Sequence, residues 1–309
     1  MSRKLISLSA AAILMSSTAM ADVPSVAVDI APVHSLVARV MRSVGEPNLI
    51  IPTNASPHRY NLRPSEAKAL QDANLVFWMG EGLAPWMENA LDSLASNAKI
   101  IALLDQKETE LMEFREGALF EEHDHDDHAD HDDHDEHAHG KYDPHAWLSL
   151  ENARTWLNLI AAQLSATDPE NAGVYFSNAA EARAELETLI SEVNKMLKPV
   201  RGMKFVVFHD AYQYFEKSFD FPASGAISLS DASDPSPARI AQIHGRIKEQ
   251  GIDCVLAEPQ YKPGLVATVL DGSSAKASVI DPLGYGLEVG EELYQQLIRQ
   301  MAKTLINCL

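Results

Sequence analysis

Positive charge is scarce in this sequence of 309 residues. It has 25 lysines and arginines against 44 aspartates and glutamates, which gives a formal net charge of −19. Such a balance argues against nucleic acid or an anionic membrane surface as a partner, and it is compatible with cations. A long apolar run is also missing after the N-terminus, so no later segment approaches the length that crosses a bilayer as a helix.

The N-terminal residues have the pattern of an export signal. Basic residues precede an apolar run from Leu5 to Met15, and Ala19-Met20-Ala21 has the small residues of a cleavage site. The run is too short to span a bilayer as a stable helix. We therefore expect residues 1–21 to be a signal peptide and the mature chain to begin at Asp22. No lipid-attachment cysteine lies near the cleavage site, so the expected location is the periplasm of a Gram-negative bacterium.

Cysteine is scarce as well, since Cys254 and Cys308 are the only two. Export exposes them to an oxidising compartment, which favours a disulfide between them. Two buried free thiols are the alternative. A zinc site built on the cysteine pair is a third interpretation, which the histidines make less attractive because they offer a better site.

Histidine and acidic residues are concentrated in one segment, from Glu121 to His139. It contains seven histidines, ten acids and two alanines, and no other residue type. Imidazole suits zinc, copper and nickel, and the segment has too little apolar surface to form a core. We expect a mobile loop that collects metal ions weakly; the alternative is a solvated acidic run that binds none. The candidate ligands of this loop are His123, His125, His128, His131, His134, His137 and His139.

The remaining composition permits a large core, because 46% of the residues are hydrophobic. Short apolar runs alternate with helical stretches on both sides of a predicted helix from Pro169 to Lys198. Asp168 is placed to cap this helix and Pro199 to end it. At 1.5 Å per residue it would be on the order of 45 Å long. The predicted strands are Val26–Ile30, Asn48–Ile51, Leu75–Met79, Ile100–Leu104, Phe205–Phe208, Cys254–Ala257 and Ser278–Ile280.

This pattern predicts an α/β fold of two (β/α) lobes joined by a long rigid backbone helix. The N-terminal lobe would span residues 22–167 and include the loop 121–139. Residues 168–199 would form the linking helix, and residues 200–309 the C-terminal lobe.

Four isolated side chains lie just after a predicted strand or just before a predicted helix. They are His58, His145, His209 and Asp281. In open α/β sheets the carboxyl ends of the strands form the edge where ligands bind. Two of the four would come from each lobe, so we expect a metal site in the cleft between the lobes. Three imidazoles and one carboxylate are a plausible tetrahedral zinc shell.

Each of these residues also has a structural explanation. His58 after Pro57 would suit a turn, His145 a helix N-terminus, and Asp281 before Pro282 an Asx-type turn. His209 is the hardest to explain in this way, because it ends an apolar strand. His34 and His244 lack a comparable context, and we interpret both as structural.

Several motifs together resemble the periplasmic zinc-binding proteins of bacterial high-affinity zinc ABC transporters, the ZnuA type. These motifs are PHRYNLRPSEAKALQDANLVFWMG, the His/Asp loop, DPHAWLSL, FHDAYQYF, AEPQ and DPLG. The resemblance implies a bilobed fold with a linking helix, a metal between the lobes, and His58, His145 and His209 as ligands. Manganese-binding relatives typically carry a glutamate where this chain has His209. Some zinc members have a glutamate ligand where this chain has Pro57, so the fourth ligand is either Asp281 or a water.

The sequence is thus interpreted as an extracytoplasmic protein that captures Zn²⁺ and delivers it to an inner-membrane ABC permease. It would be a monomer and no enzyme, with periplasmic metal chaperones as further candidate partners. The alternatives are a manganese- or iron-binding transport protein, a zinc chaperone, and a zinc hydrolase. The sequence contains no HExxH motif that would support the hydrolase.

Overall fold

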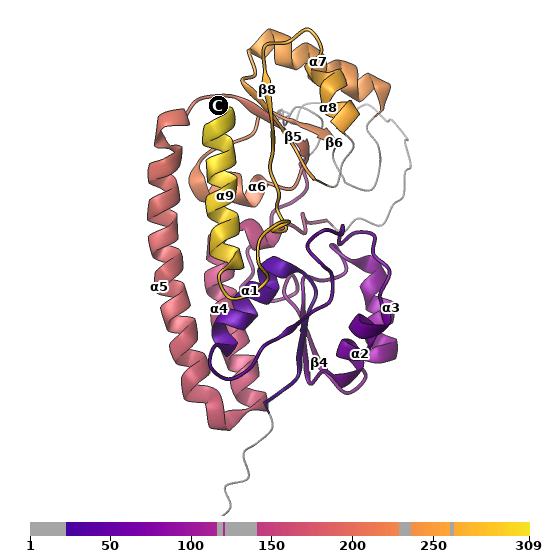
Figure 1. Cartoon of the computed structure of the whole chain (residues 1–309), viewed down its shortest axis with the longest axis vertical. Helices are drawn as coiled ribbons and strands as arrows, with labels where there is room; N and C mark the ends of the chain where they lie inside the picture. Colours follow the sequence, from indigo (N-terminus) through magenta and orange to yellow (C-terminus); the bar gives the residue numbers. More distant parts are fainter. Residues whose placement is uncertain (1–22, 116–119, 121–140, 229–235, 260–262) are drawn as a thin grey trace, which may run out of the picture.

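Two parallel β-sheets form the centres of two lobes in the computed structural model of the chain (Figure 1). The structure describes residues 23–115, 120, 141–228, 236–259 and 263–309. The predicted signal peptide, residues 1–21, and the predicted metal-collecting loop, residues 121–139, lie outside these ranges. Within the described ranges, no helix is long and apolar enough to cross a membrane.

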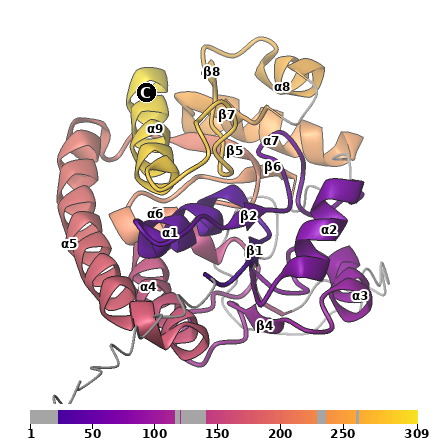
Figure 2. The same ribbon diagram turned by 60° about the horizontal axis from the view of Figure 1, so that its bottom comes forward.

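The N-terminal lobe is built on a parallel sheet with the strand order β2-β1-β3-β4. β1 and β3 are buried along their whole length, which accounts for their continuous apolar sequences. Helices α2 and α3 lie on one side of this sheet and α1 on the other (Figures 1 and 2). The strands are β1 (Val26–Val28), β2 (Asn48–Leu49), β3 (Leu75–Trp78) and β4 (Lys99–Ala102), and the helices are α1 (Ala31–Met41), α2 (Pro64–Asp72) and α3 (Pro85–Leu94).

The C-terminal lobe repeats this plan with the strand order β6-β5-β7-β8, again all parallel. Three of its strands coincide with predicted ones. The sequence pattern did not predict β6, because it has only three residues and offers no alternation to detect. The strands are β5 (Phe205–His209), β6 (Ala226–Ser228), β7 (Cys254–Ala257) and β8 (Lys276–Val279), and the helices are α6 (Gln213–Phe219), α7 (Pro237–Gln250) and α8 (Pro263–Leu270).

A long helix, α5 (Ala172–Leu197), runs beside both lobes, as expected from the apolar stripe in its sequence (Figure 1). It follows α4 (Leu150–Thr167), whose first turn is capped by the Ser149 hydroxyl, which accepts the N–H of Asn152. The predicted start at Pro169 is a 3₁₀ turn instead (Pro169–Asn171). The Asp168 carboxylate holds this turn through the Asn171 amide and the Tyr175 hydroxyl, both at 2.7 Å.

The last helix, α9 (Leu293–Cys308), connects the two lobes a second time, because it packs against α1 of the N-terminal lobe, against α5, and against β8 of the C-terminal lobe. Near its start, the Ser35 hydroxyl of α1 donates to the Glu291 carbonyl at 3.0 Å and accepts the Tyr294 N–H at 2.9 Å. The Tyr294 hydroxyl donates to the Trp147 carbonyl at 2.8 Å. The start of α9 therefore belongs structurally to the N-terminal lobe.

The end of α9 is bonded to the other lobe by the predicted disulfide between Cys254 in β7 and Cys308. Both residues are buried, at 0% and 3% exposed. We expect the Cys308→Ser variant to lose about 2–5 kcal/mol of unfolding free energy, because the bond closes a loop of 54 residues in the unfolded chain. Urea denaturation without reductant measures this loss, and the Cys254→Ser/Cys308→Ser double variant should match the single one. An unchanged midpoint would contradict the prediction.

Candidate metal centre

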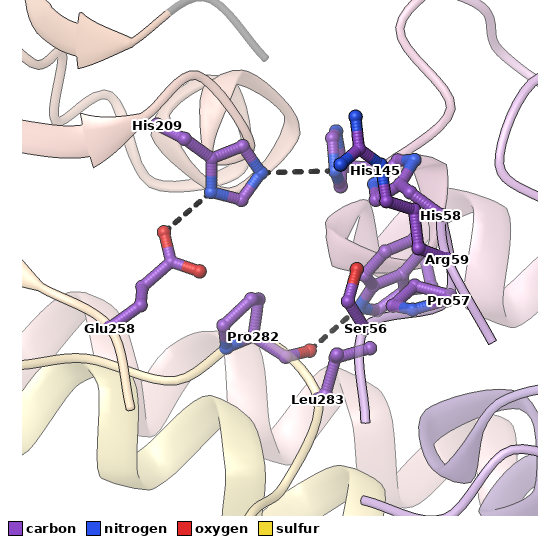
Figure 3. A pocket seen from close by; sticks show the side chains of 10 residues that line it. Ser56, Pro57, His58, Arg59, His145, His209, Glu258, Pro282 and Leu283 are labelled. Atoms are coloured by element: carbon purple, nitrogen blue, oxygen red, sulfur yellow. Dashed lines mark hydrogen bonds and ion pairs between the residues drawn. The ribbon is translucent and has the colours of Figure 1, made fainter. Parts of the chain in front are cut away.

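Three predicted ligands line one small cavity between the lobes, and each comes from a different segment. His58 lies in the connection after β2, His145 immediately precedes the short 3₁₀ helix Ala146–Leu148, and His209 is the last residue of β5. The cavity has a volume of about 130 Å³. That is below the 300–1,000 Å³ typical of organic ligands, and it suits an ion with a few waters. The lining residues are Ser56, Pro57, His58, Arg59, His145, Trp147, His209, Glu258, Pro282 and Leu283 (Figure 3).

The histidines of opposite lobes face each other through their Nε2 atoms. The Nε2 atoms of His145 and His209 are 3.3 Å apart, and the ring centroids are 5.1 Å apart. Two nitrogens bound to one tetrahedral zinc at 2.0–2.1 Å would be about 3.3 Å apart, with ring centroids roughly 5 Å apart. The rings of His58 and His145 are 5.5 Å apart, close to the same spacing. The geometry of this cluster therefore matches one edge of a zinc shell, with a third imidazole beside it.

The third imidazole is not yet in a ligand position. Within the described part of the chain, no group of three or more His, Cys, Asp or Glu side chains is arranged as a complete metal site. The His58 and His145 ring planes make an angle of 57°, similar to the 65° between His145 and His209. The three rings are neighbours, and their binding of one shared ion stays a prediction.

In each of the two facing histidines, the other ring nitrogen, Nδ1, contacts a carboxylate. His209 Nδ1 is 2.6 Å from Glu258 Oε1, and His145 Nδ1 is 2.6 Å from Asp143 Oδ1. An ionised carboxylate only accepts hydrogen bonds, so both Nδ1 atoms carry the proton and both Nε2 atoms present a lone pair. Carboxylates arranged in this way fix the tautomer and the orientation of a metal-binding imidazole.

The charge of Asp143 is maintained although the residue is fully buried. Burial would raise the pKa of Asp143, but the electrostatic and hydrogen-bond interactions with His145 and the hydrogen bond from Gln213 lower it below its usual range. The carboxylate is therefore ionised at neutral pH and can accept the Nδ1 proton of His145.

Asp281 is placed differently from the histidines. Its carboxylate accepts the backbone N–H groups of Leu283 at 3.3 Å and Tyr285 at 2.5 Å, as an Asx-type turn former would. Burial raises the pKa of this carboxyl, the N–H donors oppose that shift, and the charge of nearby Glu258 adds to it. Asp281 does not line the cavity, whereas its neighbours Pro282 and Leu283 do. Its role as the fourth ligand stays a prediction.

Two histidines interpreted as structural make ordinary backbone contacts. His34 in α1 is buried and places Nε2 2.9 Å from the Pro47 carbonyl, and His244 in α7 places Nε2 2.6 Å from the Asp271 carbonyl. Neither lines the cavity. The seven histidines between His123 and His139 lie outside the described residues.

The sequence analysis assigned no role to Glu258, Asp143 or Trp147. Glu258 directly follows β7, so the strand-end rule that singles out His209 applies to it as well. Asp143 is two residues before His145, a spacing that lets one carboxylate oxygen accept both the backbone N–H at 2.9 Å and the ring N–H. The indole of Trp147 closes the cavity wall and donates to the Pro282 carbonyl at 2.8 Å.

The chain is similar to proteins of known name over nearly its whole length. Residues 26–308 match the family described as "Zinc-uptake complex component A periplasmic". The "High-affinity zinc uptake system protein ZnuA" of Brucella abortus (strain 2308) is 44% identical over 304 residues, which cover 92% of this chain and 91% of the relative. The protein of the same name from Paracoccus denitrificans (strain Pd 1222) is 42% identical over 308 residues, which cover 94% and 93%.

Solved structures share the fold at lower identity. "Crystal structure of ZnuA" superimposes with a TM-score of 0.75 at 22% identity and covers 93% of this chain and 99% of its own. "Structure of the SBP FpvC from pseudomonas aeruginosa in complex with Mn2+" has a TM-score of 0.77 at 20% identity, with 93% and 98% covered. At these identities the likeness concerns the two-lobed fold alone.

Proposed function

This chain belongs to the family of periplasmic zinc-uptake components, and from that premise we propose that it captures Zn²⁺ in the cleft between its lobes and delivers it to an ABC permease in the inner membrane. Along the chain, residues 22–167 and 200–309 supply the two lobes and residues 168–199 the link between them, with the start of α9 packed on the N-terminal lobe. One chain supplies ligands from both lobes, so a monomer is sufficient for the site, and we expect the protein to work as one. Residues 1–21 direct it to the periplasm and are removed on export.

The observation that carries this proposal is the 3.3 Å separation of the His145 and His209 Nε2 atoms across the lobes. His58, whose ring centroid is 5.5 Å from that of His145, is the third nitrogen ligand of this set. The fourth position belongs to a water or to Asp281. Because nitrogen ligands outnumber oxygen ligands, the site favours zinc over manganese, which prefers carboxylates and carbonyl oxygens.

The cavity also favours a carrier over a hydrolase. A zinc hydrolase needs a general base near the metal-bound water and space for its substrate. Glu258, the carboxylate in the cavity wall, is engaged with His209 Nδ1 at 2.6 Å, and the volume of about 130 Å³ leaves little space for an organic substrate. Transfer of zinc to periplasmic metal chaperones would use the same site, and only the recipient would differ.

Uptake experiments distinguish delivery to the permease from simple buffering. In cells that lack their own zinc-binding protein, expression of this chain should restore growth and radioactive zinc uptake under zinc limitation. The Lys217→Gln variant, which removes an exposed side chain away from the cavity, is the matched control and should restore uptake fully. Rescue by a His209→Ala variant at the level of the intact protein would contradict the proposed site.

The loop from Glu121 to His139 is expected to add weak binding only. In a calorimetric zinc titration, deleting it should remove the extra weak equivalents expected of the intact protein and leave one tight zinc per molecule, because the cleft ligands lie on folded strand ends. A second variant with all seven loop histidines changed to serine keeps the negative charge and separates imidazole binding from electrostatic attraction. Loss of the tight equivalent on deletion would mean that the loop supplies a primary ligand.

A further inference from the structure

The carboxylate that orients His145 is itself held from the opposite lobe. Asp143 Oδ1 accepts the ring N–H of His145, and Asp143 Oδ2 accepts the amide of Gln213 at 2.5 Å. Gln213 is the first residue of α6 in the C-terminal lobe. The Gln213 amide must present its nitrogen on this side, because that atom faces two hydrogen-bond acceptors, the Asp143 carboxylate and the Glu113 carbonyl, the latter at 3.2 Å.

This chain of contacts is shielded from water. Asp143 is 0% exposed, His145 5% and Gln213 5%. A buried carboxylate oxygen that loses its donor bears the full desolvation penalty, so the Gln213 contact has a large influence on where the Asp143 carboxylate lies. The neighbouring Tyr214 hydroxyl donates to the Asp143 carbonyl at 2.9 Å, which places a second contact from α6 on the same residue.

His209 is supported differently. Its carboxylate partner, Glu258, follows β7, and His209 ends β5, which is paired with β7 in the same sheet. The His209–Glu258 pair therefore moves as part of one lobe. The His145–Asp143 pair keeps its hydrogen bond from Gln213 only while α6 of the C-terminal lobe packs against it.

We propose that Gln213 is a positioning residue that couples contact between the lobes to the orientation of His145, so that separating the lobes weakens the zinc site on its N-terminal side first. This inference rests on the proposed zinc site. It implies that a permease that pulls the lobes apart breaks the Gln213–Asp143 bond, releases the imidazole of His145 from its ligand orientation, and leaves zinc held by His58 and His209.

The test compares zinc dissociation rates, measured by transfer to an excess of a chromogenic chelator. Gln213→Met keeps the length of the side chain and removes the N–H donor. We expect dissociation to become 10–100-fold faster, the range typical for loss of an outer partner of a metal ligand. Lys217→Gln is the matched control, because Lys217 also reaches from α6 to the other lobe, at Glu110, but both side chains are exposed and neither contacts a ligand. Its rate should equal that of the intact protein.

A double-variant cycle separates positioning from general destabilisation. In an Asp143→Asn background, Gln213→Met should add little, since the contact through which it acts is already changed. The ligand-field bands of bound Co²⁺ should shift in Gln213→Met and in Asp143→Asn alike, and stay unchanged in Lys217→Gln. If Gln213→Met fails to fold, Gln213→Asn keeps the amide but is too short to reach Asp143, and it should show the same faster release.

Two results would overturn the inference: a Gln213→Met rate equal to that of the intact protein, or the full acceleration persisting in the Asp143→Asn background. Failure of the proposed function gives a distinct outcome. In that case the intact protein itself would lack a tight zinc equivalent, and no dissociation phase could be measured for any variant.

Discussion

Replacing His209 with alanine is expected to abolish tight zinc binding while the protein stays folded. The variant loses one of the two Nε2 atoms that are 3.3 Å apart, and it also leaves Glu258 without its ring N–H donor. The loss in affinity should exceed the 10–100-fold that removal of an outer partner produces. Calorimetric titration of metal-free protein, with a competing chelator for the tight range, measures it. We expect His58→Ala and His145→Ala to behave in the same way.

The same chain provides controls for this series. His34→Ala and His244→Ala remove imidazoles that contact backbone carbonyls away from the cavity, so zinc affinity should change little. Asp281→Ala should cost less than any of the three histidine variants, because a water can occupy the fourth position. If His34→Ala or His244→Ala weakened zinc binding as much as His209→Ala does, the ligand assignment would be wrong.

Removing Arg115 is expected to destabilise the fold by about 3–5 kcal/mol at neutral pH, as is typical when one partner of a buried ion pair is lost. Its guanidinium contacts two buried carboxylates, Asp210 at 3.0 Å through Nε and Glu216 at 2.7 Å through Nη1. In Arg115→Met both carboxylates remain buried without their cation. The exposed pair of Arg42 with Glu181 is the control, because Arg42→Met should destabilise the fold far less than Arg115→Met does.

The loss of unfolding free energy in Arg115→Met should increase as the pH rises. Burial raises the pKa of the Glu216 carboxyl, and hydrogen bonds from Arg115 and the Ala223 N–H oppose that shift. Without the guanidinium the folded-state pKa rises further above the unfolded value. Such a group stabilises the fold below the unfolded pKa of about 4 and loses that contribution as pH rises through the folded value. The deficit measured by urea denaturation should therefore be larger at pH 7 than at pH 4.5, and a constant deficit would argue against buried carboxylates as its cause.

Much of the fold was predictable because it depends on local patterns. The apolar runs at β1, β3, β5 and β7 are short, continuous and rich in β-branched or aromatic residues, as strands buried in a parallel sheet require. The long helix was predictable from one apolar stripe at helical spacing. Its first turn was not, because the choice between an α-helix and a 3₁₀ turn at Pro169 depends on how Asp168 bonds to Asn171 and Tyr175.

The histidines were predictable for a topological reason. The carboxyl ends of parallel strands meet at one edge, so a polar residue directly after a strand, such as His209, is expected at that edge without knowledge of any contact. The supporting contacts were not predictable, because they join residues far apart in the chain. Gln213 and Asp143 are separated by 70 positions, and Arg115 and Asp210 by 95. A single sequence has no local signal for such pairs.

The position of α9 determines the order in which this protein can fold after export. The helix follows both sheets along the chain, yet its buried face packs against α1 of the first lobe and against α5. A chain that emerges N-terminus first therefore leaves the apolar surface that α9 covers exposed until the segment from Leu293 onward has arrived. The Cys254–Cys308 disulfide likewise cannot form until Cys308, near the end of the chain, lies beside Cys254. The disulfide can therefore form only after α9 is present. A chain truncated before α9 would lack the helix that packs against α1 and α5, so the first lobe would be incomplete as well as the second.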